Sequence, residues 1–286
     1  MSAGRGTLYV VATPIGNLGD VTLRSLEVLK AVPLVAAEDT RLTRRLFSRY
    51  RIETRLVSYH ARSGPGREAE LLTHLRGGAD LALVTDAGTP GVSDPGEGLV
   101  AAWAAEGGSV VPIPGASAVL AAVAASGVAG PRWAFEGFLP RSGRERRERL
   151  ARVAADNRGA VLFEAPGRVA ATLRDLAAAC GGERRAAVCR EMTKIHETVV
   201  RGTLEELAAA ARDGTIPARG EFVLVIGGIE GTARGSVADA EAAAEGARAE
   251  VERLVGEGIA RGEAARRVAA ATGIPRRRLY GASREG

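Results

Sequence analysis

The feature that most constrains the fold is a regular alternation of short apolar runs and helical stretches, which continues to about residue 228. Runs that are apolar throughout are typical of strands covered on both faces, as in parallel sheets with helices on each side. In the first half the expected strands are Leu8–Ala12, Leu34–Ala37, Leu56–Ser58, Leu81–Thr85 and Val110–Ile113. The expected helices between them are Thr22–Lys30, Leu42–Arg49, Glu68–Leu75 and Gly98–Glu106. The alternation predicts an α/β fold with a largely parallel sheet.

A second series of the same kind follows. Its expected strands are Ala134–Gly137, Ala160–Phe163, Ala186–Cys189, Val199–Gly202 and Phe222–Ile226. Its expected helices are Ala116–Ala125, Arg144–Ala155, Val169–Ala179 and Leu204–Arg212. The helix after Pro114–Gly115 connects the two halves, so we expect two α/β domains, 1–114 and 115–230, with a cleft between them.

After Gly228 the composition changes, and residues 231–286 are expected to be a linker and a small helical extension. The expected elements are a linker, Gly231–Gly235, and three helices, Asp239–Val255, Arg261–Ala271 and Arg276–Tyr280. The last two resemble a helix-turn-helix, because Gly273 can cap the first and Pro275 can open the second. A plain helical hairpin that packs on the body is the alternative.

Three loops rich in Gly and Pro follow directly after strands of the first half. They are Ala12–Asp20 (ATPIGNLGD), Thr85–Gly96 (TDAGTPGVSDPG) and Ile113–Ala118 (IPGASA). Open α/β sheets bind ligands outside the carboxyl ends of their strands, and glycine lets a backbone approach a ligand closely. The Asp carboxylates and backbone amides of these loops suit a cationic ligand that forms hydrogen bonds. An ordinary turn, or a helix cap at Ser117, is the alternative.

Three further segments at strand ends lie in the second half: Leu162–Arg168 (LFEAPGR), Cys189–Glu197 (CREMTKIHE) and Gly220–Ile226 (GEFVLVI). They contribute a charged group within otherwise apolar surroundings, which consists of Glu164, Glu191, Glu197, Lys194 and His196. Carboxylates with perturbed pKa values in a cleft are candidates for a functional site, whereas a structural ion-pair network is the competing interpretation.

Several classes of site are excluded by the sequence. It has no GxGxxG dinucleotide motif, no GxxxxGK[ST] phosphate loop and no GxSxG nucleophile motif. Its three histidines lack ligand spacing, so no metal is expected. Cys180 and Cys189 are expected to be reduced thiols of a cytoplasmic protein. No apolar run reaches the length of about 20 residues that spans a bilayer.

The formal net charge is +5, and Lys30 and Lys194 are the only lysines among 39 basic residues. A positive balance favours an anionic partner such as nucleic acid, although solubility explains it equally well. Arginine suits phosphate because its guanidinium offers a bidentate fork, but a GC-rich genome produces the same bias.

Taken in order, these segments resemble the ribosomal RNA small-subunit methyltransferase I family of the tetrapyrrole methylase superfamily. Three more carry the resemblance: Glu38–Arg41, Ser58–His60 and Phe135–Arg141 (FEGFLPR). It covers about residues 6–228, and the C-terminal helices match the family's usual extension. One departure is Gly167, where the family commonly has His, and another is the looser segment Ala61–Arg67.

The resemblance implies a homodimeric two-domain methylase that binds S-adenosylmethionine in the interdomain cleft. It also implies transfer to the 2′-hydroxyl of a cytidine in the decoding region of small-subunit ribosomal RNA, with free RNA or the assembled 30S subunit as partner. The cofactor contacts implied by position are Pro14, Asp86, Gly88, Thr89, Ser117, Ala118, Phe163, Glu164, Met192, Gly220 and Glu221. The expected RNA-binding residues are Arg41, Arg44, Arg45, Arg62, Arg141, Arg144, Arg146, Arg147, Arg276, Arg277 and Arg278.

A ribose hydroxyl needs a nearby base to accept its proton. Asp39 and Glu38 are the candidates, because they follow an apolar strand and precede an Arg-rich helix. A helix N-cap with an acidic neighbour is the alternative interpretation of the same pair. Lys194 is a reserve candidate, provided that burial lowers its pKa.

The sequence is compatible with two other functions. One is methylation of a corrin or porphyrin precursor, against which the basic balance and the C-terminal extension speak. The other is a nucleic-acid-binding regulator with a degenerate ligand cleft. Such a protein would have lost the ligand-binding residues of its loops, whereas the Asp- and Gly-rich segments of this chain are intact.

Overall fold

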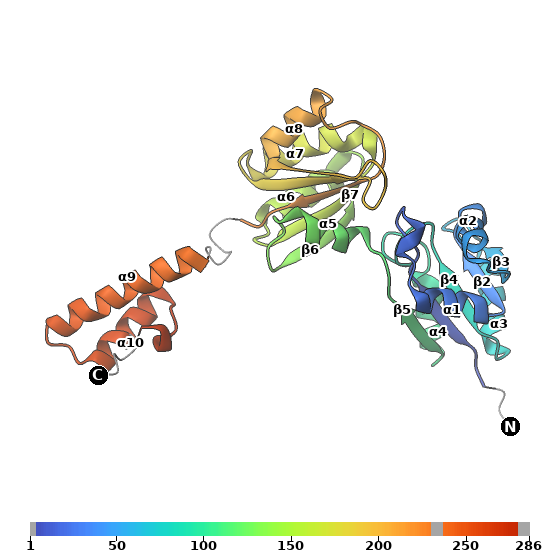
Figure 1. Ribbon diagram of the computed structural model, residues 1–286, viewed down its shortest axis with the longest axis horizontal. Coiled ribbons are helices and arrows are strands. Elements are labelled where there is room, and N and C mark those ends of the chain that lie inside the picture. Colours follow the sequence, from blue (N-terminus) through green and yellow to red (C-terminus); the bar gives the residue numbers. More distant parts are fainter. Residues whose placement is uncertain (1–3, 230–236, 280–286) are drawn as a thin grey trace. The chain divides into compact units, whose positions relative to one another are not determined.

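A computed structural model describes residues 4–229 and 237–279 of the chain (Figure 1). The chain divides into two compact units, Met1–Ile229 and Glu230–Gly286. The larger unit contains two five-stranded sheets, and the smaller one is helical. The mixed α/β class predicted from the sequence is confirmed. The predicted limits of the two α/β domains stay a prediction.

The first sheet is parallel throughout. Its strands are β1 (Thr7–Val11), β2 (Leu34–Ala37), β3 (Arg55–Ser58), β4 (Leu81–Val84) and β5 (Ser109–Ile113). They lie in the order β3-β2-β4-β1-β5, and each neighbouring pair is parallel. The parallel sheet predicted for the first half is therefore confirmed, and the carboxyl ends of all five strands meet at one edge.

Helices cover both faces of this sheet. They are α1 (Leu23–Ala31), α2 (Thr40–Tyr50), α3 (Pro65–Arg76) and α4 (Glu97–Ala105). Alternate residues of β2 divide between two cores, Leu34 with α3 and α4, and Val35 with α1 and α2. This division follows from the two-residue period of a strand, and it explains why β2 is apolar at every position.

The second sheet is mixed, so the parallel pairing of the first sheet does not continue in it. Its strands are β6 (Trp133–Phe138), β7 (Gly159–Glu164), β8 (Arg185–Arg190), β9 (Thr198–Thr203) and β10 (Phe222–Ile226). They lie in the order β6-β7-β10-β8-β9, and only β6 and β7 pair in parallel. Apolar runs are equally compatible with antiparallel pairing when both faces are covered, so the sequence pattern alone did not separate the two arrangements.

Four helices cover this sheet: α5 (Ala118–Ser126), α6 (Gly143–Ala155), α7 (Val169–Cys180) and α8 (Leu204–Arg212). One core joins α6, α7 and α8 to one face, and another joins α5 to the opposite face. The pairing register places Phe222, at the start of β10, beside both Glu164 and Arg190, at the ends of β7 and β8. The loop before β10 therefore lies at the same edge as the loops after β7 and β8.

The smaller unit packs α9 (Val237–Gly256) against α10 (Arg261–Thr272) through a core that includes Val251 and Val268. Gly273 ends α10 in the left-handed conformation, as predicted. The predicted second helix of a helix-turn-helix is wrong for the described residues, because Arg276–Arg278 form a single 3-10 turn. Tyr280 and the predicted linker Gly231–Gly235 lie outside the described residues. Among the helices that the structure describes, none is long and apolar enough to cross a membrane.

Candidate active site

A cavity of about 380 Å³ lies where the strand-end loops of the larger unit meet. The loops come from both sheets, and the cavity is closed on one side by the start of α5. Its lining residues are Ile15, Ala87, Gly88, Thr89, Val92, Ser93, Asp94, Ser117, Ala118, Val119, Phe138, Phe163, Glu164, Ala165, Pro166, Met192, Gly220, Glu221, Phe222 and Val223. We call this space the donor cavity. Its volume falls within the usual range of small-molecule sites, about 300–1,000 Å³.

Nine of the eleven predicted cofactor contacts line the donor cavity. They are Gly88, Thr89, Ser117, Ala118, Phe163, Glu164, Met192, Gly220 and Glu221. Pro14 and Asp86 do not line it, although their neighbours Ile15 and Ala87 do. The structure thus brings together residues that are far apart in the sequence, while their contact with a cofactor stays a prediction.

Several lining residues were not predicted from the sequence, and Asp94 and Phe138 are the most informative of them. Asp94 lies inside the loop Thr85–Gly96, so the loop was identified but this residue was not selected from it. Phe138 ends β6 with 53% of its surface exposed, and its ring centroid lies 5.6 Å from that of Phe163. Phe163 also meets Phe135 edge-on at 5.0 Å. The rings of Phe138 and Phe163 give the cavity an apolar wall that can receive a flat aromatic ligand.

Two backbone hydrogen bonds fix the first two loops against each other. The N–H of Thr13 donates to the carbonyl of Gly88 at 2.8 Å, and the N–H of Gly88 donates to the carbonyl of Thr13 at 3.0 Å. Gly88 has a φ of 82°, a conformation that side chains disfavour. Ser117 accepts a hydrogen bond from the N–H of Leu120 at 3.4 Å, so it also caps α5, as the alternative interpretation held.

Three carboxyl groups lie close together at the edge of the first sheet. Burial raises the pKa of Asp94 to about 6, and the neighbouring carboxylates of Glu38 and Asp86 act in the same direction. Burial also raises the pKa values of Glu38 and Asp86. Asp94 is the member of this group that lines the donor cavity. A half-buried carboxylate beside an apolar wall favours a cationic ligand, because the cation offsets the cost of burying the negative charge.

Asp39 has a different environment from these three. Its side chain accepts a hydrogen bond from the N–H of Arg41 at 2.8 Å and thereby caps α2. Hydrogen bonds from the Arg41 guanidinium and from the same N–H lower the pKa of Asp39 to about 2. Such a carboxylate is a weak base near neutral pH. The structure therefore matches the N-cap alternative for Asp39.

Lys194 lies between two carboxylates. Its Nζ is 2.9 Å from Oε1 of Glu191 and 3.0 Å from Oε2 of Glu221. Burial opposes the charged form, but the hydrogen bonds to Glu191 and Glu221 outweigh it, so the pKa of Lys194 is raised. The condition under which Lys194 could act as a base, a lowered pKa, is therefore contradicted. Lys194 therefore matches the competing interpretation, in which these charged residues form a structural ion-pair network.

Glu164 takes part in a second network, in which its side chain is fully buried. It accepts a hydrogen bond from Oγ1 of Thr172 at 2.6 Å, and Nε of Arg168 lies 3.2 Å from its Oε1. Gly167 lies in the turn between them and has open space around it. The carboxylate of Glu164 thus positions the loop after β7, besides lining the donor cavity.

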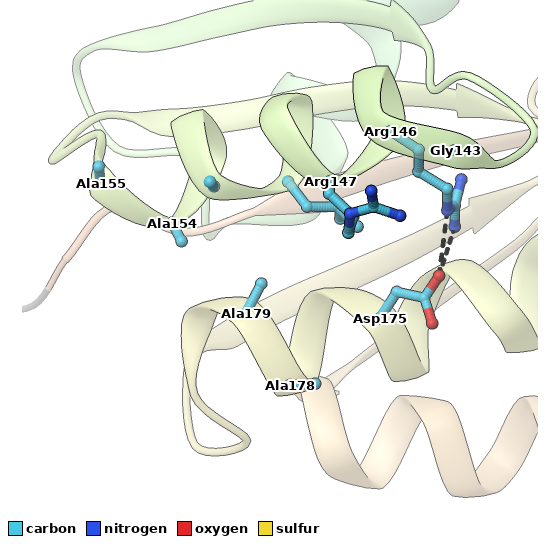
Figure 2. A pocket seen from close by; sticks show the side chains of 10 residues that line it. Gly143, Arg146, Arg147, Ala154, Ala155, Asp175, Ala178 and Ala179 are labelled. Atoms are coloured by element: carbon cyan, nitrogen blue, oxygen red, sulfur yellow. Dashed lines mark hydrogen bonds and ion pairs between the residues drawn. The ribbon is translucent and has the colours of Figure 1, made fainter.

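The arginines expected to bind RNA fall into two groups. Most are exposed, and these are Arg41, Arg44, Arg45, Arg62, Arg141, Arg144, Arg147, Arg276, Arg277 and Arg278. Arg146 is an exception, because its side chain is only 9% exposed and lies between α6 and Asp175 of α7 (Figure 2). Its guanidinium donates to Asp175, to the hydroxyl of Thr172 and to the carbonyl of Pro140. Arg146 is therefore a structural residue of the second sheet's core, and its assignment to RNA binding is corrected.

The groove in Figure 2 lies between α6 and α7 and shares no lining residue with the donor cavity. Five of its ten lining residues are alanine, and Arg146, Arg147 and Asp175 are the charged ones. Across residues 4–229 and 237–279, no three His, Cys, Asp or Glu side chains are grouped so that they could hold a metal ion.

Comparison with known proteins shows the family to which the chain belongs, and that family agrees with the geometry of the donor cavity. A family model described as Tetrapyrrole (Corrin/Porphyrin) Methylases matches residues 7–208, so the two sheets and their shared cavity define an α/β methylase of that class. Ribosomal RNA small subunit methyltransferase I of Synechocystis sp. is 47% identical over 280 residues, which cover 98% of each chain. The protein of the same name from Xylella fastidiosa is 44% identical, over 96% of this chain and 98% of its own. The chain belongs to the ribosomal RNA small subunit methyltransferase I family.

Solved structures support the fold. Uroporphyrin-III C-methyl transferase from Thermus thermophilus, complexed with S-adenyl homocysteine, superposes with a TM-score of 0.56 at 21% identity. The match covers 78% of this chain and 97% of that one. At this identity the likeness establishes the fold, while the family assignment rests on the more similar relatives.

Proposed function

We propose that this chain uses S-adenosylmethionine to methylate the 2′-hydroxyl of a cytidine ribose in the decoding region of small-subunit ribosomal RNA. The observation that carries the proposal is the convergence of nine predicted contact residues on one cavity. The names of the relatives, which specify methylation of small-subunit ribosomal RNA, agree with it.

The donor cavity suits S-adenosylmethionine in three respects. Phe163 and Phe138 offer faces for an adenine ring, and the backbone around Gly88 and Gly220 offers polar groups for the ribose. Asp94 and Glu221 offer carboxylates to the ammonium and sulfonium charges. When bound, this cofactor supplies a methyl group that is already activated by its sulfonium.

The chain's own contribution is to orient the acceptor and to receive its proton. Correct alignment of two reacting groups removes about 7–11 kcal/mol from a bimolecular barrier. Of the two predicted carboxylate bases, Glu38 has a pKa raised by burial whereas that of Asp39 is lowered, and Oε2 of Glu38 accepts a hydrogen bond from the N–H of Asp86 at 3.4 Å. Glu38 therefore stays the candidate proton acceptor, and it acts with assistance of about 10²–10⁴-fold in rate.

The exposed arginines supply the RNA contact. Arg44 and Arg45 lie on α2, directly after the Glu38–Asp39 pair. Arginine pairs with phosphate bidentately, and a set of such contacts makes binding strongly dependent on salt.

The partner is the small-subunit RNA or the assembled 30S subunit, and the working form is a homodimer in the cytoplasm. Sedimentation at micromolar concentration tests the dimer.

The experiment uses the full chain, labelled S-adenosylmethionine and small subunits from cells that lack this gene. We expect one labelled 2′-O-methylcytidine in the decoding region. Ala118→Phe, which fills the donor cavity, should lower cofactor affinity measured by calorimetry at least about tenfold. Ala124→Phe, on the exposed side of the same helix, is the matched control and should bind normally.

Label on a base instead of a ribose would contradict the proposed chemistry. A tetrapyrrole precursor offered under the same conditions tests the other activity named by the family model. Turnover of that precursor without transfer to ribosomal RNA would replace the proposal with the alternative.

A further inference from the structure

A second cavity, of about 420 Å³, adjoins the donor cavity. Its lining residues are Tyr59, His60, Ala61, Ser63, Gly64, Pro65, Glu68, Asp94, Pro95, Gly96, Glu97 and Gly98. Asp94 is the residue that the two lining sets share. The walls come from the loop after β3, the start of α3 and the loop that joins β4 to α4. Because β3 and β4 are parallel strands of one sheet, these loops lie at the same edge as the donor cavity.

Contacts hold the walls of this second cavity in place. The hydroxyl of Tyr59, which is 7% exposed, donates to Oε2 of Glu68 at 2.8 Å. A Cβ at Gly98 would lie 3.2 Å from the same oxygen, so the carboxyl group packs closely against the start of α4. The Nδ1 of His60 accepts a hydrogen bond from the N–H of Arg62 at 3.1 Å. In the neutral ring this leaves the N–H at Nε2.

The residues that line the second cavity do not suit phosphate, but they do suit a group that donates hydrogen bonds. Of the twelve described residues that line the cavity, none is Lys or Arg, so it does not suit phosphate. Glu68 and Glu97 present acceptors, and a carboxylate can accept several hydrogen bonds. Glu and Asp recognise cytosine by accepting from its exocyclic amino group, whereas uracil places an oxygen at that position.

We propose that the second cavity holds the base of the acceptor nucleotide, and that Glu68 selects cytosine over uracil by accepting a hydrogen bond from the amino group. The ribose of the same nucleotide then lies beside Asp94, next to the donor cavity. This inference rests on the proposed function, because it assigns the base of the nucleotide whose ribose is methylated.

The test compares small subunits that carry either C or U at the methylated position. The unaltered protein should methylate the C form with a kcat/KM at least about tenfold higher. Glu68→Gln can donate to uracil, so it should lose about tenfold on the C form and reduce the preference for C to about threefold or less. Glu70→Gln, on the same helix but outside both cavities, is the matched control and should behave as the unaltered protein does.

A second variant and a binding measurement keep the outcomes distinct. Tyr59→Phe removes the hydrogen bond to Glu68 but leaves its charge, and it should reduce turnover of the C form by less than Glu68→Gln does. Both variants should bind S-adenosylmethionine normally, since neither residue lines the donor cavity. Loss of cofactor affinity in Glu68→Gln would contradict the inference that Glu68 contacts the base and not the cofactor.

Equal methylation of the C and U forms by the unaltered protein would overturn the inference but leave the proposed function intact. An unchanged preference in Glu68→Gln would likewise reject Glu68 as the selecting residue. Normal cofactor binding with no transfer to either form would overturn the proposed function, and this inference would fall with it.

Discussion

The backbone N–H of Asp39 donates a hydrogen bond to Oδ1 of Asp86 at 2.9 Å and thereby joins the loops that follow β2 and β4. Both residues were predicted to act in the site, one as a base and one as a cofactor contact. The structure uses them to hold the edge of the first sheet together. The pKa values of Asp86 and of the neighbouring carboxyl groups of Glu38 and Asp94 are raised, and Glu38 stays the proposed proton acceptor.

We predict that Asp39→Ala affects stability more than chemistry. Removing the N-cap of α2 and the partner of Arg41 should lower the melting temperature by about 2 °C, while kcat falls less than about tenfold. Because the pKa of Asp39 is lowered to about 2, its contribution to stability is present above the unfolded pKa near 3.8 and is lost as the pH falls towards 2. Ser142→Ala, at an N-cap without a side-chain bond, is the control. A loss of turnover beyond a hundredfold with normal cofactor affinity would restore Asp39 as the base.

Cofactor binding should depend on the ionisation of Asp94. Its pKa is about 6, so the carboxylate that attracts a cation is present at pH 7.5 and disappears as the pH falls below 6. Asp94→Asn should therefore weaken S-adenosylmethionine binding about tenfold at pH 7.5, measured by calorimetry. In the variant the decline of affinity between pH 7.5 and 5.5 should be absent. Asp213→Asn, an exposed acid at the end of α8, should retain that decline. Equal pH dependence in both variants would exclude Asp94.

The carboxylate of Asp94 should reduce the stability of the ligand-free protein near neutral pH. The pKa of Asp94 is raised from 3.8, so the native state favours the protonated form. Its contribution to stability is fully present below pH 3.8 and is lost as the pH rises through 6. Asp94→Asn should raise the melting temperature by about 2 °C at pH 7.5 and leave it unchanged near pH 4. An equal shift at both pH values would point to packing instead of charge.

Lys194 should prove structural. Lys194→Met leaves the carboxylates of Glu191 and Glu221 without their shared cation, so we expect a melting temperature lower by about 2 °C at pH 7.5. Because the pKa of Lys194 is raised, the alkaline limb of the kcat profile should be the same in the variant and the unaltered protein. Lys194→Arg keeps the charge and should recover most of the stability. A turnover loss that Arg does not recover, at normal stability and cofactor affinity, would contradict this role.

Substitution of exposed arginines should weaken RNA binding, whereas substitution of the buried Arg146 should destabilise the fold. Arg44→Gln together with Arg45→Gln should reduce the slope of log affinity for RNA against log salt by about 2, one for each phosphate contact. Arg146→Gln should leave that slope unchanged. It should instead destabilise the fold by about 3 kcal/mol, because Asp175 and Thr172 lose a buried partner. Denaturant unfolding and filter binding at four salt concentrations measure the two effects. A lower salt slope in Arg146→Gln would show that Arg146 contacts RNA after all.

The sequence by itself determined the elements and the loops that matter. The short apolar runs and the helical stretches between them located the strands and helices within a few residues, because they are local properties of the chain. The Gly- and Pro-rich loops were identified from their position after strands. Four of their residues line one cavity, together with five residues of the second-half segments, and all nine were named by the family resemblance.

Only the tertiary structure decided the strand directions of the second sheet and the burial and electrostatic surroundings of individual side chains. Antiparallel pairing of β10 with β7 and β8 depends on chain segments far apart in the sequence, and an apolar run does not encode the direction of its neighbour. The same holds for Arg146, Asp94 and Lys194, whose residue types are ordinary. Their roles follow from what surrounds them in space, since desolvation and nearby charges set a pKa and neither is visible in a linear sequence.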